Sequence, residues 1–145
     1  MARPIADAAV DAVDAAGARD RAAFEAAVGR LAGFDVAQVG LLLGTVVRQA
    51  LEEGHPDGLD SDDVRDTLAG VVKQATEWVD AVDPQVVLML LAGALGVLET
   101  DPDERPVRAD VSARHAVLLV AHLVDPAAFA ARLERAAREL AQNAE

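Results

Sequence analysis

Three aspartates near the middle of the chain, Asp62, Asp63 and Asp66, have the residue type and the spacing that can hold a divalent cation. Hard cations such as Mg²⁺ prefer oxygen ligands, and side chains three or four positions apart share one face of a helix. An Asp-Ser pair directly before them is a good N-cap, so they fall in the first turns of a helix predicted over residues 61–79. Carboxylates in that position also interact favourably with the helix dipole, without any metal.

The DDxxD pattern of these aspartates resembles the one with which prenyl-diphosphate enzymes hold magnesium. Together with the downstream ExxD of Glu77 and Asp80, it resembles the magnesium sites of the all-helical MazG-type nucleotide pyrophosphohydrolases. If residues 61–79 are one helix, however, Asp66 and Glu77 lie about 16 Å apart along its axis, too far to share an ion. We therefore expect no metal site and no bound cofactor. The same three aspartates remain the candidates for a magnesium-dependent, pyrophosphohydrolase-like alternative.

Two histidines, His115 and His122, are the other residues whose chemistry deserves a test. They are seven positions apart, so they lie on one side of a helix but about 10 Å apart, too far for one metal ion. With Ser112 and Leu119 they form a stripe that we interpret as a solvent edge or a subunit contact. No nucleophile elbow or strand supports a Ser-His-Asp triad, so we predict no catalytic residue and favour a protein that is not an enzyme.

Four glycines, Gly40, Gly44, Gly93 and Gly96, fall within predicted helices, where each costs about 1 kcal/mol relative to alanine. Three arrangements could offset that cost. The favoured one is a close approach between the two helices that carry them. The second is contact between one of these helices and the same helix of a second copy. The third is room for a small ligand. The four glycines are thus predicted to mark a close helix contact or a pocket.

The helices that must position these residues follow from hydrophobic periodicity. The stretch PQVVLMLLAGALGVL, residues 84–98, carries no charge and starts with Pro84 after the N-cap residue Asp83. Since it is shorter than the roughly 18 residues of a membrane span, it is interpreted as a buried central helix. The other predicted helices cover residues 4–16, 20–30, 36–53, 61–79, 111–124 and 126–141, of which the first two could be one bent helix.

The predicted fold is therefore an all-α single domain over residues 1–145, a bundle or short helical array of five to six helices around that central helix. Residues 1–16 could be a loosely packed N-terminal helix or one exchanged between subunits. An offset of 48 residues between Asp35 and Asp83 also aligns two helix-loop-helix segments. That period is close to the length of HEAT-type repeats, which leaves a two-fold pseudo-repeat as an open alternative.

The charge and the composition limit the function. A net charge of −12 repels a phosphate backbone, so we expect no nucleic-acid partner. There is no cysteine and no signal-peptide pattern at the N-terminus, so we expect a cytoplasmic protein without a membrane partner. The leading hypothesis is a non-catalytic protein-protein interaction or regulatory domain of unknown partner that forms a homodimer or other homo-oligomer. The alternative is a small-ligand-binding helical bundle.

Overall fold

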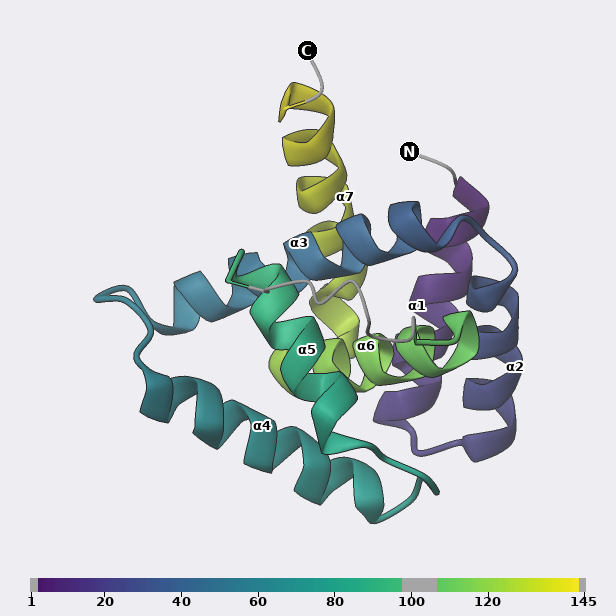
Figure 1. Ribbon diagram of the computed structural model, residues 1–145. Helices are drawn as coiled ribbons and strands as arrows, with labels where there is room; N and C mark the ends of the chain where they lie inside the picture. The colour runs from purple at the N-terminus through teal and green to yellow at the C-terminus, as the bar shows by residue number, and fades with distance from the viewer. Residues whose placement is uncertain (1–2, 98–106, 144–145) are drawn as a thin grey trace.

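The computed structural model describes residues 3–97 and 107–143. These residues form seven α-helices and no strand (Figure 1), which confirms the predicted all-helical array; the number slightly exceeds the predicted five to six because the first two predicted helices are separate. The helices are α1 (Arg3–Gly17), α2 (Arg21–Ala32), α3 (Val36–Gly54), α4 (Ser61–Thr76), α5 (Pro84–Ala94), α6 (Ala109–Leu123) and α7 (Pro126–Asn143).

The helix at the centre of the described fold is α6. It packs against α1, α2, α3, α4 and α5, and it crosses behind α5 in Figure 1. Its buried residues are Ala113, His115, Ala116, Val117, Leu118, Leu119 and Val120. The central position predicted for residues 84–98 is therefore taken by α6, and α5 is one of the helices that cover it.

The one-sided burial of α5 explains this correction. The helix begins as predicted, because the Asp83 carboxylate accepts the Gln85 N–H at 2.9 Å and Pro84 occupies the first helical position. Leu88, however, is 40% exposed. A helix without charges need not be surrounded, since apolar atoms make up a large part of any protein surface. The side chains of α5 that are buried are Val86, Val87 and Leu91.

The end of α5 also differs from the prediction. The helix stops at Ala94, and Gly96 follows with a φ of +75°. The Val97 N–H then bonds back to the Ala92 carbonyl at 2.9 Å, as in a Schellman motif. Gly96 is therefore a helix terminator and not a helix-face residue. Leu98, the predicted last residue, lies outside the described residues.

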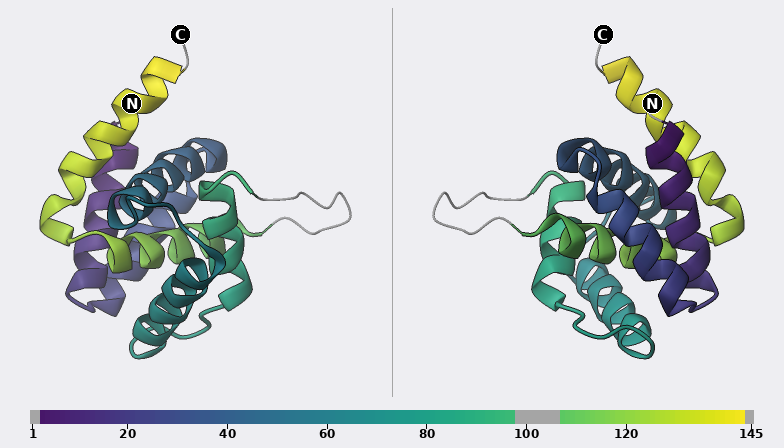
Figure 2. Two further views of the ribbon diagram at one scale, coloured as in Figure 1. Left: turned by 90° about the vertical axis from the view of Figure 1, so that its left-hand side faces the viewer. Right: turned by 90° about the vertical axis from the view of Figure 1, so that its right-hand side faces the viewer.

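The two flanks of the fold are formed by the N-terminal and C-terminal helices. α1 and α2 pack closely as a hairpin, and α1 also contacts α6 and α7 of the same chain. The face of α1 that makes these contacts consists mainly of alanines, which permit a short distance between helices. Figure 2 shows α7 lying against α1 and α3, with its C-terminal half extending beyond them.

Ion pairs between α3 and α7 fasten the C-terminal helix. Glu53 at the end of α3 accepts a hydrogen bond from Arg135 of α7 and forms an ion pair with Arg132 of the same helix. The hydrogen bond from Arg135, and then the contact with Arg132, lower the pKa of Glu53 below its usual value. One turn earlier, Arg48 pairs with Glu139 of α7. These pairs orient α7 relative to α3.

The 48-residue offset seen in the sequence aligns the segment of α3 and α4 with the segment of α5 and α6. In one segment, α5 packs against α6. In the other, α4 packs against α5 and α6 rather than against α3, so the two aligned segments are not equivalent helix pairs.

In the described part of the chain, no single helix has both the length and the apolar character needed to cross a membrane. α6 and α7 meet that test only when taken together, and the chain bends by 112° between them.

Candidate functional site

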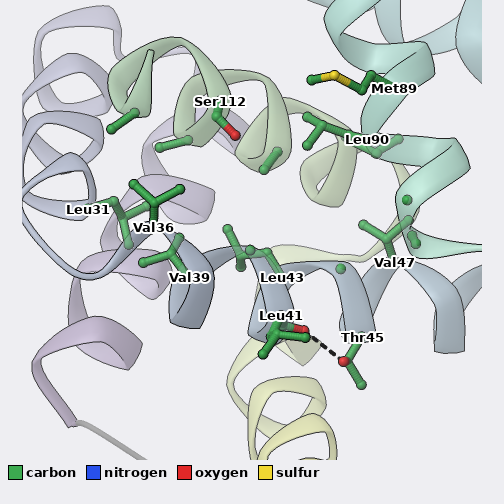
Figure 3. Close-up of a pocket in the computed structure, with 18 of the residues that line it drawn as sticks. Leu31, Val36, Val39, Leu41, Leu43, Thr45, Val47, Met89, Leu90 and Ser112 are labelled. Carbon is green, nitrogen blue, oxygen red and sulfur yellow. Dashed lines mark hydrogen bonds between the residues drawn. The ribbon is translucent and has the colours of Figure 1, made fainter. Parts of the chain in front are cut away.

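A pocket of the described structure lies between α3, α5 and α6, with the end of α2 closing one side. Its volume is about 410 Å³, within the range of small-ligand sites. Figure 3 shows α3 on one side of the pocket, α6 opposite it and α5 across one end. Three helices that are distant in sequence thus enclose one space.

Glycines of the predicted set line this pocket. Gly40 and Gly44 come from α3, one helical turn apart, and Gly93 comes from α5. A Cβ atom added at Gly40 or Gly44 would have no neighbouring atom within 4 Å. The favoured explanation, close helix approach within one chain, is therefore wrong for these two positions. Gly96 belongs to the turn after α5 and is not among the residues that line the pocket.

Two glycines outside the predicted set lie in close contact with another helix. A Cβ at Gly17 would lie 2.7 Å from Cγ of Pro126, and a Cβ at Gly70 would lie 2.9 Å from the ring of His122. Both glycines are isolated in sequence, so no spacing could have indicated them. Gly29 on α2 is exposed and has open space around its Cβ position, and nothing in the structure explains it.

The walls of the pocket are apolar. Leu31, Val36, Val39, Leu43 and Leu90 are among the side chains that Figure 3 shows around it. At its mouth, Val36 and Leu41 are 55% and 60% exposed, the largest exposures among the big apolar side chains of α1 to α6. A ligand in this pocket would be held mainly by apolar contact.

Three polar side chains also line the pocket, Thr45, Ser112 and Arg48. The Thr45 hydroxyl donates a hydrogen bond to the Leu41 carbonyl at 2.7 Å, drawn as the dashed line in Figure 3. Ser112 extends from α6 toward the pocket in the same view. Arg48 is the only ionisable residue among the described residues of the lining.

Two of the three predicted metal candidates, Asp62 and Asp63, have structural partners. The N–H of Asp63 bonds to the Asp60 carboxylate at 2.8 Å, and the N–H of Asp60 bonds to the Asp63 carboxylate at 3.0 Å, which makes a capping box. Asp62 is exposed beside Arg65, at 3.6 Å. α4 runs without a break from Ser61 to Thr76, so Asp66 in its second turn is separated from the ExxD, which begins only after the helix ends. Over residues 3–97 and 107–143, no group of three acidic or histidine side chains is placed to hold a metal.

The histidine stripe of α6 is not a solvent edge. His115 is 1% exposed, and Leu119 beside it is buried as well. The ring of His115 can be buried because both nitrogens are bonded to backbone: Nε2 accepts the Asp83 N–H at 2.9 Å, and Nδ1 donates to the Val111 carbonyl at 2.7 Å. This pair of bonds ties the start of α5 to α6.

His122 lies at a second, smaller space of about 210 Å³ between the end of α1, α4 and α6. Its Nδ1 is 2.7 Å from Oε1 of Gln74, and its ring packs over Gly70. Burial lowers the pKa of His122 below its usual value. The two histidines therefore have separate structural environments, and neither lines the large pocket.

Comparison of the chain with protein-family models, with curated proteins and with solved structures gives no match. A functional proposal for this protein must therefore come from its own geometry. The feature that offers one is the apolar pocket with glycines on two of its helices.

Proposed function

We propose that this protein is a non-catalytic binding domain that takes a small apolar ligand in the pocket between α3, α5 and α6. The observation that carries the proposal is the pair Gly40 and Gly44. These glycines weaken α3, but no packed atom requires them, and they line the pocket.

The glycines of α3 have an energetic cost that needs an explanation. Glycine in a helix interior is about 1 kcal/mol less favourable than alanine. At Gly17 and Gly70 a neighbouring side chain accounts for the cost, because a Cβ would collide with it. At Gly40 and Gly44, the space that a side chain would occupy is part of the pocket. Larger side chains at these positions would extend into the space that a ligand needs.

The chemistry of the lining supports binding rather than catalysis. The pocket offers two hydroxyl groups, those of Thr45 and Ser112, and one arginine that is already paired with carboxylates. Neither hydroxyl has a histidine beside it among the lining residues, so no activated nucleophile is formed. This composition favours an apolar ligand with at most a few hydrogen-bonding groups.

The proposal can be tested with N-phenyl-1-naphthylamine, an uncharged probe that becomes fluorescent in apolar surroundings. We expect one saturable site per chain, and we expect Gly44→Leu to abolish it by filling the pocket. Gly29→Leu is the matched control, because Gly29 is also a helix glycine with open space around its Cβ position but lies outside the pocket. No saturable binding by the unaltered protein, or equal binding by Gly44→Leu, would refute the proposal.

A second candidate function, self-association, has support in the exposed mouth of the same pocket. Val36 and Leu41 stand there in a segment, residues 36–47, that has no charged side chain in a chain of net charge −12. Two copies could meet at this face without like-charge repulsion. Light scattering tests it: a dimer is expected, Leu41→Glu should give monomers, and Ala131→Glu on the exposed side of α7 should not. A monomeric unaltered protein at high concentration would exclude this candidate.

A further inference from the structure

We infer that the ion pairs of Arg48 with Glu52 and Glu139 make the pocket select uncharged ligands and reject anionic ones. The inference rests on the proposed function, since it assigns a ligand class and a specificity-determining residue to the same pocket. It starts from the fact that Arg48 is the only ionisable residue in the described lining.

The guanidinium of Arg48 is occupied on both sides. One terminal nitrogen bonds to the Glu52 carboxylate, one turn further along α3, at 2.5 Å. The other bonds to the carboxylate of Glu139, which α7 brings to this point and which also accepts the side-chain amide of Gln49 at 3.3 Å. Arg48 and Glu139 are each about one-third exposed. These three groups together carry a formal charge of −1, and Arg135 of α7, which is itself paired with Glu53, also acts on Glu139.

The charges of Arg48 and Glu139 are fixed around neutral pH. The hydrogen bond to Glu139, and then the one to Glu52, raise the pKa of Arg48. The hydrogen bond from Arg48, and then the one from Gln49, lower the pKa of Glu139. Arg48 and Glu139 therefore both remain ionised near neutral pH, so their pairing does not depend on small changes of pH.

An arginine without these partners would have the opposite effect on ligand choice. Its planar donors match carboxylate, sulfonate and phosphate groups, and an arginine at the wall of an apolar pocket is a common anchor for such anions. Because Arg48 already bonds two carboxylates, an anionic ligand would find the guanidinium charge compensated, would gain less from the three N–H donors that remain, and would face both carboxylates. An uncharged ligand is not repelled by these carboxylates and makes the same apolar contacts with the pocket.

The test uses two probes with the same aromatic scaffold. 1-Anilinonaphthalene-8-sulfonate is N-phenyl-1-naphthylamine with one added sulfonate, so the ratio of their dissociation constants reports the effect of the charge. We expect the sulfonate to bind at least about tenfold more weakly to the unaltered protein. Glu139→Gln should release Arg48 and strengthen sulfonate binding by about fivefold or more, with the affinity for the uncharged probe unchanged within about twofold.

Glu134→Gln is the matched control for the total charge. Glu134 is an exposed residue of the same helix α7, and its replacement removes one negative charge without touching Arg48. Sulfonate affinity should therefore stay at the level of the unaltered protein in this variant. Arg48→Met, which keeps an apolar stem but removes the guanidinium, should weaken sulfonate binding further because Glu52 and Glu139 lose their cation.

The outcomes separate this inference from the proposed function. If the uncharged probe binds, but the sulfonate binds equally well or responds alike to Glu139→Gln and Glu134→Gln, the role of Arg48 is wrong and the pocket proposal stands. If Gly44→Leu fails to abolish binding of the uncharged probe, the pocket proposal itself is wrong. A folded Arg48→Met variant that binds the sulfonate more tightly would also overturn the inference.

Discussion

Replacing Gly40 or Gly44 by alanine should make the protein more stable, which is the opposite of what a packed helix contact would give. At each position an added Cβ meets no atom within 4 Å, so the substitution creates no collision. Both residues lie inside α3, at least four positions from its ends. The backbone therefore gains the full helix preference of alanine without a packing penalty.

The magnitude follows from the helix propensities. Each substitution should raise the free energy of unfolding by about 0.5–1 kcal/mol, and the double variant by about 1–2 kcal/mol. For a chain of 145 residues, each kcal/mol corresponds to roughly 3 °C in Tm, so the double variant should melt about 3–6 °C higher. Gly17→Ala should act in the opposite direction, by about 1–3 kcal/mol, because its Cβ would lie 2.7 Å from the ring of Pro126.

Urea unfolding followed by circular dichroism at 222 nm measures these changes. The midpoint should rise for Gly40→Ala and Gly44→Ala without a change in the slope m, since the surface exposed on unfolding is nearly the same. A loss of more than about 0.5 kcal/mol at either position would mean that the space above α3 is filled in solution. That result would refute the reasoning that these glycines serve a pocket.

Four further changes in stability are expected, and each can be measured by the same urea titrations. His115→Leu should cost about 1–3 kcal/mol, because the bond from the Asp83 N–H to the buried His115 ring is lost; an unchanged midpoint would contradict this. Ala81→Gly should add about 0.5–1 kcal/mol, because Ala81 holds a φ of +59° that glycine adopts without strain, and a lower midpoint would exclude that explanation. Burial lowers the folded-state pKa of His122, so the unfolded chain binds the proton more readily and stability should fall as the pH falls below about 6.5, an effect that His122→Gln should remove. The arginines of α7 lower the pKa of Glu53, so a second loss should follow as the pH falls from about 4.5 through the folded-state pKa, and it should be smaller in Glu53→Gln.

Helix starts were the part of the fold that the sequence predicted best, because a cap is a local interaction. Asp20, Asp35, Asp60 and Asp83 each accept a backbone N–H from the first turn of the helix that follows. Each cap involves residues no more than three positions apart, so a single sequence contains all the information needed. The all-helical class follows from the same periodic patterns.

The arrangement of the helices could not be predicted in the same way. Residues 84–98 have the most apolar pattern, yet α6 is central because five helices pack against it, and that is a property of the whole chain. Likewise, spacing would pair Arg135 with Glu139 along α7, whereas the structure pairs Arg135 with Glu53 and Glu139 with Arg48 on α3. Partners across the fold depend on which helices meet, and local spacing does not determine that.

The same limit applies to the candidate site. Helix glycines at Gly40, Gly44 and Gly93 were a usable signal, because their cost asks for an explanation. Whether that explanation is a neighbouring helix or an open space depends on atoms of α6, which lies more than sixty residues after Gly40 and Gly44 in sequence. No sequence pattern indicated the pairing of Arg48 with Glu139, because Glu139 belongs to α7 and is far from Arg48 in sequence.

The position of α6 after five of its packing partners in the sequence has a consequence for biosynthesis. Helices α1 to α5 are translated before it, yet all five use it as their common packing partner. While the chain is still attached to the ribosome, their apolar faces have no α6 to cover them, and they stay open to chaperones or to other nascent chains. We expect stable tertiary structure to form only after Leu123 has left the ribosomal tunnel, so this domain should acquire its core in one late step and not helix by helix.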